Sequence, residues 1–182
     1  MGISKRNVGK IFETNFKKSI PDYCMIQRLN DPPQGFIESS TARFAPKNPC
    51  DYIIFDSKGR ILYCLELKTT KYKSISFEDV NEEKQSEKMI HKHQILGLLD
   101  MSKHDHVCAG FVCNFRDEEK GLERTYYQSV QDFLKMVDGI GKKSFNEMDL
   151  ILNGAIKIIG KKYKVNHYWD VDGFMKKMRN EE

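Results

Sequence analysis

The segment from Asp51 to Lys68, with the sequence DYIIFDSKGRILYCLELK, constrains the fold of this chain more than any other segment. Residues 51–55 and 61–68 are rich in β-branched and aromatic side chains, and a glycine-containing turn sequence at 56–59 separates them. This pattern predicts a β-hairpin, and we expect the rest of the chain to be organised around it.

Three charged side chains of this hairpin are candidates for chemistry. Side chains alternate between the two faces of a strand, so Glu66 and Lys68 should share one face with Cys64. The opposite face should carry the apolar residues Tyr63, Leu65 and Leu67. Asp51 lies at the mouth of the first arm, from which it can meet Glu66 and Lys68 across the hairpin.

Two carboxylates beside a lysine suit the cleavage of a phosphodiester. Mg²⁺ prefers oxygen ligands and keeps several waters, so Asp51 and Glu66 are candidate metal ligands. A bound Mg²⁺ polarises a phosphate oxygen and lowers the pKa of a coordinated water, while Lys68 can position that water or neutralise charge that builds on phosphorus. The alternative interpretation is an ordinary hairpin with surface charges, because such a short pattern often arises by chance.

Composition restricts the class of protein without revealing its activity. With 182 residues the chain is expected to form one domain, 1–182, and to bury a sizeable core. Apolar residues at 40% and charged residues at 31% fit a soluble globular protein, and no segment has the roughly 18 apolar residues of a membrane span. The net charge of +4 and the pI of about 8.7 permit a polyanionic partner.

The cysteines and histidines favour a reduced protein without a zinc site. The five cysteines are odd in number and scattered, and no apolar leader segment begins the chain, so we expect free thiols and a cytoplasmic location. Cys108 and Cys113 lack the spacing of metal ligands. His91 and His93 are two residues apart in a predicted helix, so they should not share a helix face.

The chain begins with a predicted amphipathic helix over residues 4–20, with Ser4 as its N-cap and Pro21 ending it. Glu13 lies at the edge of the apolar stripe, one turn after Gly9, and a glycine at that place leaves room for a bulky ligand. The alternative interpretation of Glu13 is an ordinary solvated helix glutamate.

The remaining elements are expected to alternate between strands and helices. Residues 36–50 form the longest segment between predicted core elements, and a long loop of this kind in a compact domain is usually functional or disordered. A polar segment with two lysines around a tyrosine, 69–74, suits a phosphate backbone or is an ordinary solvated loop. The expected strands are 23–29, 106–116, 123–130, 155–159 and 163–168, the last two separated by Gly160-Lys161-Lys162. The first two expected helices are 85–101, after an acidic stretch at 78–88, and 131–138, capped at Ser129. A short helix capped by Ser144 and Glu147 follows, and a basic helix capped by Asp170 or Asp172 ends the chain.

Several fragments of the chain, taken in order, resemble a known family. The fragments are Gly9 to Glu13, Asp51 with Glu66-Leu67-Lys68, Phe77, His93-Gln94-Ile95, Gly110-Phe111 and Lys143-Ser144-Phe145. Asp51 and the Glu66-Leu67-Lys68 triplet resemble the signature of the PD-(D/E)XK nucleases, although Pro49 is displaced by one position from the proline of that motif. The whole set resembles the RecU-type Holliday junction resolvases, including smaller phage-encoded relatives, over roughly residues 7–169.

The resemblance implies an α/β fold with a restriction-endonuclease-like core, in which helices flank a mixed central β-sheet. It also implies a homodimer that cuts four-way DNA junctions with Mg²⁺, or with Mn²⁺ as a substitute. By this resemblance Asp51 and Glu66 are metal ligands, Lys68 is the catalytic lysine, Glu13 completes the metal shell directly or through water, and Gln94 supports the site or orients the DNA.

The resemblance further implies a protruding stalk at about residues 31–47 that enters the junction centre. Arg43 and Lys47 of that stalk are candidate phosphate contacts, together with Lys10, Lys71 and Lys73 elsewhere. Some relatives are thought to interact with recombinases. Because acidic residues repel phosphate, the acidic linker at 78–90 is expected to lie away from the DNA cleft.

Other functions remain open at this point. Another PD-(D/E)XK enzyme, of the restriction or repair type, would cut linear duplex and ignore junctions. A non-cleaving module for branched DNA would bind without Mg²⁺ and form no product. A general nucleic-acid-binding protein with an accidental motif is a further alternative, and any model with phosphate contacts requires affinity that falls with salt.

Overall fold

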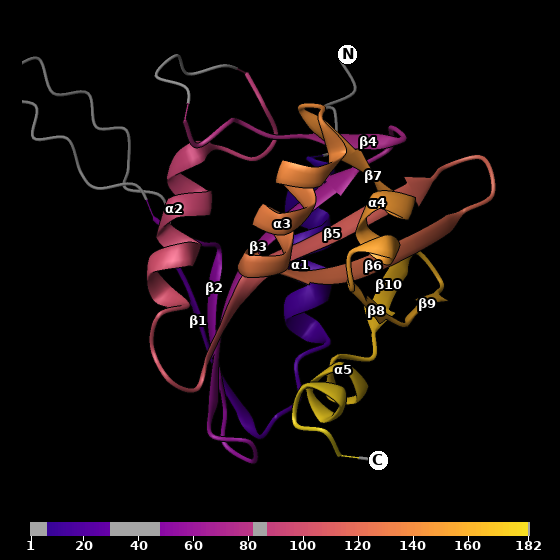
Figure 1. Cartoon of the computed structure of the whole chain (residues 1–182). Helices are drawn as coiled ribbons and strands as arrows, with labels where there is room; N and C mark the ends of the chain where they lie inside the picture. Colours follow the sequence, from indigo (N-terminus) through magenta and orange to yellow (C-terminus); the bar gives the residue numbers. More distant parts are fainter. Residues whose placement is uncertain (1–6, 30–47, 82–86, 182) are drawn as a thin grey trace, which may run out of the picture.

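The computed structural model describes residues 7–29, 48–81 and 87–181, and its centre is a six-stranded mixed β-sheet with helices on both faces (Figure 1). The strand order is β1-β2-β3-β5-β6-β8. The strands are β1 (Cys24–Arg28), β2 (Tyr52–Asp56), β3 (Ile61–Thr70), β5 (Val107–Asp117), β6 (Leu122–Ser129) and β8 (Ile156–Ile158). Only the β3–β5 pair is parallel among these neighbours. The predicted α/β fold with a mixed sheet is confirmed.

Helices cover the two faces of the sheet unequally. α1 (Val8–Lys18) and α5 (Val171–Met178) share one apolar cluster, whereas α2 (Lys92–Met101), α3 (Val130–Ile140) and α4 (Glu147–Leu152) pack into the other. Figure 1 shows α1 behind the sheet and α3 in front of it. Two small ribbons complete the structure, β4 (Ser74–Ser76) with β7 (Ser144–Asn146) and β9 (Gly160–Tyr163) with β10 (Asn166–Trp169).

The predicted hairpin is confirmed as β2 and β3, which pair in antiparallel register with Tyr52 opposite Leu65. The alternation along β3 is confirmed as well. The residues Tyr63, Leu65 and Leu67 pack into the cluster under α1 and α5, whereas Cys64 packs into the cluster under α2 and α3. Because both faces of β3 are covered, the charged residues of its second face are removed from bulk water.

Two predicted helix starts are wrong. α1 begins at Val8, where the Asn7 side chain accepts a hydrogen bond from the Lys10 amide, and the proposed cap Ser4 lies outside the described residues. α2 begins at Lys92 rather than at residue 85, because Ile90 forms a parallel bridge with Phe77 and the backbone is still extended at the N-cap. At α2 the apolar pattern continues past the point where a tertiary contact holds the chain extended.

The C-terminal third differs from expectation in its short elements. α4 is capped reciprocally by Asn146 and Asp149, not by Ser144 and Glu147, because Ser144 pairs with Ser76 in the β4–β7 ribbon. The Gly160-Lys161-Lys162 segment, expected as a connection, is strand β9 itself. The strands at 106–116 and 123–130 and the helix capped at Ser129 are confirmed as β5, β6 and α3, and Asp170 is the cap of α5.

The proposed stalk at 31–47, with Arg43 and Lys47, lies outside the described residues. Within the described part of the chain, no helix is long and apolar enough to cross a bilayer. All five cysteines are free thiols.

Candidate active site

The β2–β3 hairpin brings Asp51 onto the side of β3. The Asp51 amide donates a hydrogen bond to the Leu65 carbonyl at 3.1 Å, which continues the antiparallel ladder by one residue beyond β2. The Asp51 carboxylate then turns onto β3, where its Oδ2 accepts a hydrogen bond from the Leu67 amide at 2.8 Å. This bond fixes the carboxylate beside the residue that lies between Glu66 and Lys68 in the chain.

Glu66 and Lys68 form an ion pair on the face of β3 that α2 covers. Lys68 Nζ lies 2.8 Å from Glu66 Oε1, and the side chains are only 15% and 5% exposed. The sequence-based prediction that these two residues share a face is therefore confirmed. Burial strengthens the attraction between the charges but also removes hydration from both, so the pair adds little net stability by itself.

Gln94 holds the Glu66 carboxylate from α2. The Gln94 Oε1 accepts a hydrogen bond from the His91 amide at 2.9 Å, and its Nε2 donates to Glu66 Oε1. The bond from a backbone amide determines which end of the Gln94 side chain faces the carboxylate. The N-terminus of α2 is thus coupled to the carboxylate on β3, as the predicted supporting role of Gln94 requires.

A second carboxylate secures the N-terminus of α2. Glu78 Oε2 accepts a hydrogen bond from the Lys92 amide at 2.7 Å, and Glu78 Oε1 lies 3.3 Å from His91 Nδ1. Glu78 is 7% exposed. Glu78, the first residue of the acidic linker that was expected to lie away from a DNA cleft, therefore uses its charge to cap the helix that carries Gln94.

Glu13 reaches the same region from α1. Its Oε2 forms an ion pair with the Arg28 guanidinium of β1 at 2.7 Å. Glu13 also lies close enough for its negative charge to raise the pKa values of Asp51 and Glu66. The structure thus brings all five predicted catalytic residues into one region, but Glu13 is directed toward Arg28.

Burial makes the carboxylates of this site costly to ionise. Desolvation is the largest cause that raises the pKa of Glu66 to about 7, the ammonium of Lys68 opposes it, and the charge of Asp51 adds to it. Burial likewise raises the pKa of Asp51, against the stabilising hydrogen bond from the Leu67 amide. Two adjacent carboxylates of raised pKa form a site at which a cation would lower the electrostatic free energy.

The donor atoms fit an ion that keeps part of its water shell. Asp51 Oδ1 and Glu66 Oε2 accept no hydrogen bond from any described residue, so each carboxylate retains one oxygen for a ligand. No group of three Asp, Glu, His or Cys side chains within 7–29, 48–81 and 87–181 is arranged to hold a metal. Two carboxylate oxygens plus waters and a substrate phosphate are a ligand set that Mg²⁺ accepts.

Of the predicted phosphate contacts, the three in the described residues, Lys10, Lys71 and Lys73, form no ion pair with this cluster. Lys10 is exposed on α1, one turn before Glu13. Lys71 and Lys73 are exposed beyond the end of β3, where they line a hollow of about 880 Å³. That hollow is also lined by the acidic residues Asp117, Glu118, Glu119 and Glu147, so its charge is mixed.

Sequence reasoning missed three supporting residues: Arg28, Glu78 and His91. The spacing of His91 and Gln94 matches a capping box, a signal that was available in the sequence. No local signal marks Arg28 or Glu78, because their partners lie in other elements. His91 and His93 were expected not to share a helix face, and their rings nevertheless stack with centroids 5.6 Å apart. They stack because His91 is not helical but lies in the extended N-cap.

Comparison with known proteins yields one informative relative. No family model matches the chain. The chain is 36% identical over 129 residues to the SPbeta prophage-derived uncharacterized protein YotM of Bacillus subtilis (strain 168). The alignment covers 70% of this chain and 58% of the relative, so the chain spans less than two thirds of that protein's length.

Proposed function

We propose that this chain is a metal-dependent DNA endonuclease that resolves four-way junctions by paired, symmetric nicks. The observation that carries the proposal is the cluster of Asp51, Glu66 and Lys68, with the Lys68 ammonium 2.8 Å from the Glu66 carboxylate. A buried and a half-buried carboxylate, both with raised pKa values and both beside a lysine, are costly for a structural hairpin and useful for phosphodiester hydrolysis.

The arrangement of elements supports a restriction-endonuclease-like core. α1 is followed by the antiparallel meander β1–β2–β3, then by α2 and by β5, which runs parallel to β3. In this arrangement adjacent strands of the meander supply Asp51 and Glu66. α1 adds Glu13 from one side and α2 adds Gln94 from the other.

Asp51 and Glu66 would hold the metal ion through Asp51 Oδ1 and Glu66 Oε2, which no described residue uses. When bound, Mg²⁺ lowers the pKa of a coordinated water and polarises the scissile phosphate. The ion pair with Glu66 holds Lys68 beside the two carboxylates. There its positive charge would offset the negative charge that develops on the phosphate. Gln94 fixes the Glu66 carboxylate, so it is a positioning residue.

Symmetric nicking of opposing strands requires two active sites related by a two-fold axis, so the active form is proposed to be a homodimer on branched DNA. We also propose that this homodimer interacts with a recombinase. The prophage origin given in the relative's name is compatible with a phage-type recombination nuclease. A nuclease of the same core that cuts linear duplex is the main alternative.

The test compares wild type with Lys68→Ala on a labelled four-way junction and on linear duplex of matched sequence, with Mg²⁺ or with EDTA. Wild type is expected to nick only the junction and only with metal, while Lys68→Ala binds the junction without cutting it. A matched control, Lys103→Ala, removes an exposed lysine at the far end of α2 and should cut normally. Equal cleavage of the duplex would reject the junction assignment, and no cleavage with any metal would reject the nuclease.

A further inference from the structure

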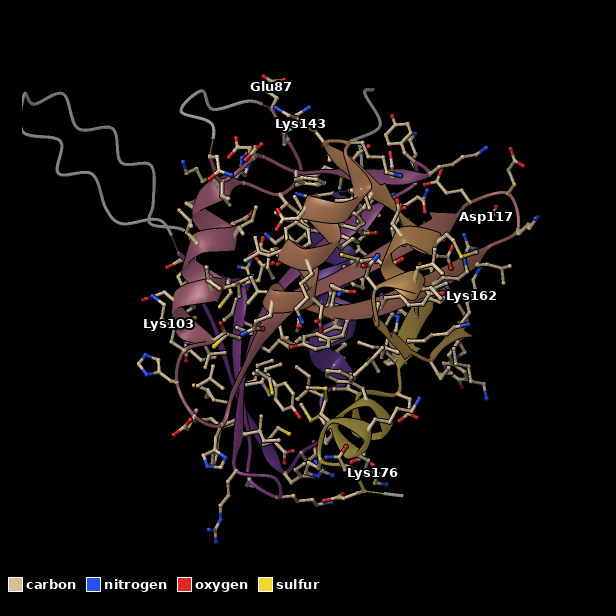
Figure 2. The ribbon with its side chains drawn as sticks, in the orientation of Figure 1. Glu87, Lys103, Asp117, Lys143, Lys162 and Lys176 are labelled. Atoms are coloured by element: carbon tan, nitrogen blue, oxygen red, sulfur yellow. The ribbon has the colours of Figure 1, made fainter. Side chains whose placement is uncertain are left out.

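The β9–β10 ribbon carries an exposed basic surface that the proposed active site does not use. Every residue of β9 is exposed, and the ribbon projects at the right of the sheet in Figure 1. Figure 2 shows the Lys162 side chain on this side of the molecule and Lys103 on the opposite side. The lysines of this region are Lys157, Lys161, Lys162 and Lys164, and all four are exposed.

These four lysines have no carboxylate partner, unlike five other exposed lysines of the protein. None of the four forms an ion pair or a hydrogen bond with any described residue, so their charge is not neutralised locally. The lysines that do pair with nearby acidic residues are Lys103, Lys120, Lys135, Lys142 and Lys176. An unneutralised group of lysines on a two-stranded ribbon is suited to bind a polyanion.

One face of the ribbon anchors it to the protein core. Trp169 of β10 is 4% exposed, packs edge-on against Phe12 of α1 with ring centroids 5.0 Å apart, and donates its indole N–H to Thr125 Oγ1 of β6 at 2.8 Å. A Cβ at Gly160, opposite Trp169, would lie 3.2 Å from the indole nitrogen, so any larger residue there would have to displace the indole ring slightly. The anchored face therefore fixes the ribbon on α1 and β6.

The other face of the ribbon points away from this anchor. Lys161 pairs across the ribbon with Tyr168, and Tyr163 pairs with Asn166, so these four side chains share one face. Tyr163 is 62% exposed, and Val165 at the tip is 86% exposed. Lysines beside exposed aromatic and aliphatic groups can contact both phosphates and the less polar sugars and bases.

The ribbon is continuous with the surface of α1 that adjoins the candidate active site. Asn166 of β10 lines a hollow of about 490 Å³ together with Lys10, Thr14 and Lys18 of α1. An α-helix has 3.6 residues per turn, so Glu13 and Thr14, three and four residues after Lys10, lie to either side of Lys10 around the helix axis. A duplex that crosses Lys10 would therefore pass from the region of Glu13 to the ribbon.

We infer that the β9–β10 ribbon and the adjoining face of α1 bind a duplex arm of the DNA substrate. The inference rests on the proposed function for the nature of the ligand. A two-stranded β-ribbon matches the width of a DNA groove, and the lysines at its edge and tip would contact the phosphates that border the groove. This surface adds affinity and orientation but takes no part in the chemistry.

The test measures binding of a fluorescent four-way junction and of a linear duplex in EDTA, over a series of salt concentrations. The variant is Lys161→Ala with Lys164→Ala, and the matched control is Lys103→Ala with Lys135→Ala, which removes the same charge from exposed sites elsewhere. Loss of two phosphate contacts should raise Kd at least about tenfold near 0.1 M salt and reduce the slope of log K against log salt by about 2. The control should change neither value.

Cleavage separates the failure of this inference from the failure of the proposed function. With saturating protein and Mg²⁺, the ribbon variant should cut the junction at the wild-type rate, because its lysines do not touch the reacting phosphate. Normal cleavage with an unchanged Kd and salt slope in the variant would overturn the inference alone. If wild type bound no DNA, both proposals would fail. Loss of binding to phosphatidylserine vesicles in the variant, with DNA binding unchanged, would reassign the ribbon to a membrane surface and overturn the inference.

Discussion

An aspartate lies at each end of β2, Asp51 half-buried and Asp56 fully buried, and the two are used differently. Asp56 at the end of the strand is 0% exposed, and its Oδ1 accepts hydrogen bonds from the amides of Lys58 and Gly59. Its Oδ2 pairs with the guanidinium of Arg179, whose side chain is 4% exposed. Both oxygens of Asp56 are therefore occupied by the protein.

Asp51, one residue before the strand, has a hydrogen bond at Oδ2 alone, from the Leu67 amide. Burial and the charge of Glu13 raise its pKa, so the protein stabilises its ionised form only partly. The number of carboxylate oxygens that the protein itself bonds therefore distinguishes a structural aspartate from a candidate ligand-binding one. A buried carboxylate whose bonds are complete secures the fold, whereas one with an unused oxygen and a raised pKa is available to a ligand.

The largest expected effect is on cleavage by Asp51→Asn. The asparagine oxygen can still accept the Leu67 hydrogen bond, so the fold should be retained while the metal loses a charged ligand. We expect the rate of junction cleavage with Mg²⁺ to fall about a thousandfold, with no loss of stability. Single-turnover cleavage and urea unfolding of the same preparation measure the two quantities. Retained cleavage would show that Asp51 does not hold the metal.

The opposite result is expected for Asp56→Asn. Removal of this charge takes the Asp56 partner from the Arg179 guanidinium, which keeps its two hydrogen bonds to Glu181, at a cost of about 3 kcal/mol in the free energy of unfolding. The variant should still cut at low temperature, where it is folded. Lys135→Ala, which breaks an exposed pair, serves as the control. A cleavage defect in folded Asp56→Asn would remove the distinction between the two ends of β2.

A smaller effect is expected in the pH dependence of stability without metal. The pKa of Glu66 is raised from 4.5 to about 7 in the folded protein, so the folded state holds this proton more tightly than the unfolded state does. Its contribution to stability is full below pH 4.5 and is lost as the pH rises through about 7. Between pH 5 and pH 8 in EDTA, wild type should lose about 2 kcal/mol that Glu66→Gln does not lose. Urea unfolding measures the free energy of unfolding of both proteins at pH 5 and pH 8. An equal loss in the two proteins would contradict this expectation.

The sequence predicted those parts of the structure that depend on neighbouring residues. The hairpin at 51–68, the long strands β5 and β6 and the cap of α3 follow from alternation, turn residues and capping spacing. Boundaries failed where a distant partner held the chain. Ile90 is kept out of α2 by Phe77, and Ser144 is kept out of the α4 cap by Ser76.

By itself the sequence determined that Glu66 and Lys68 lie on one face of a strand, since successive side chains of any strand point to opposite faces. Only the tertiary structure decided that Gln94, 28 residues later, bonds to Glu66 and that Glu13 turns to Arg28. It also decided that Lys161, Lys162 and Lys164 lie exposed on a two-stranded ribbon that Trp169 anchors to the core. Local patterns set the direction of a side chain, but the partner it meets depends on how distant elements pack together.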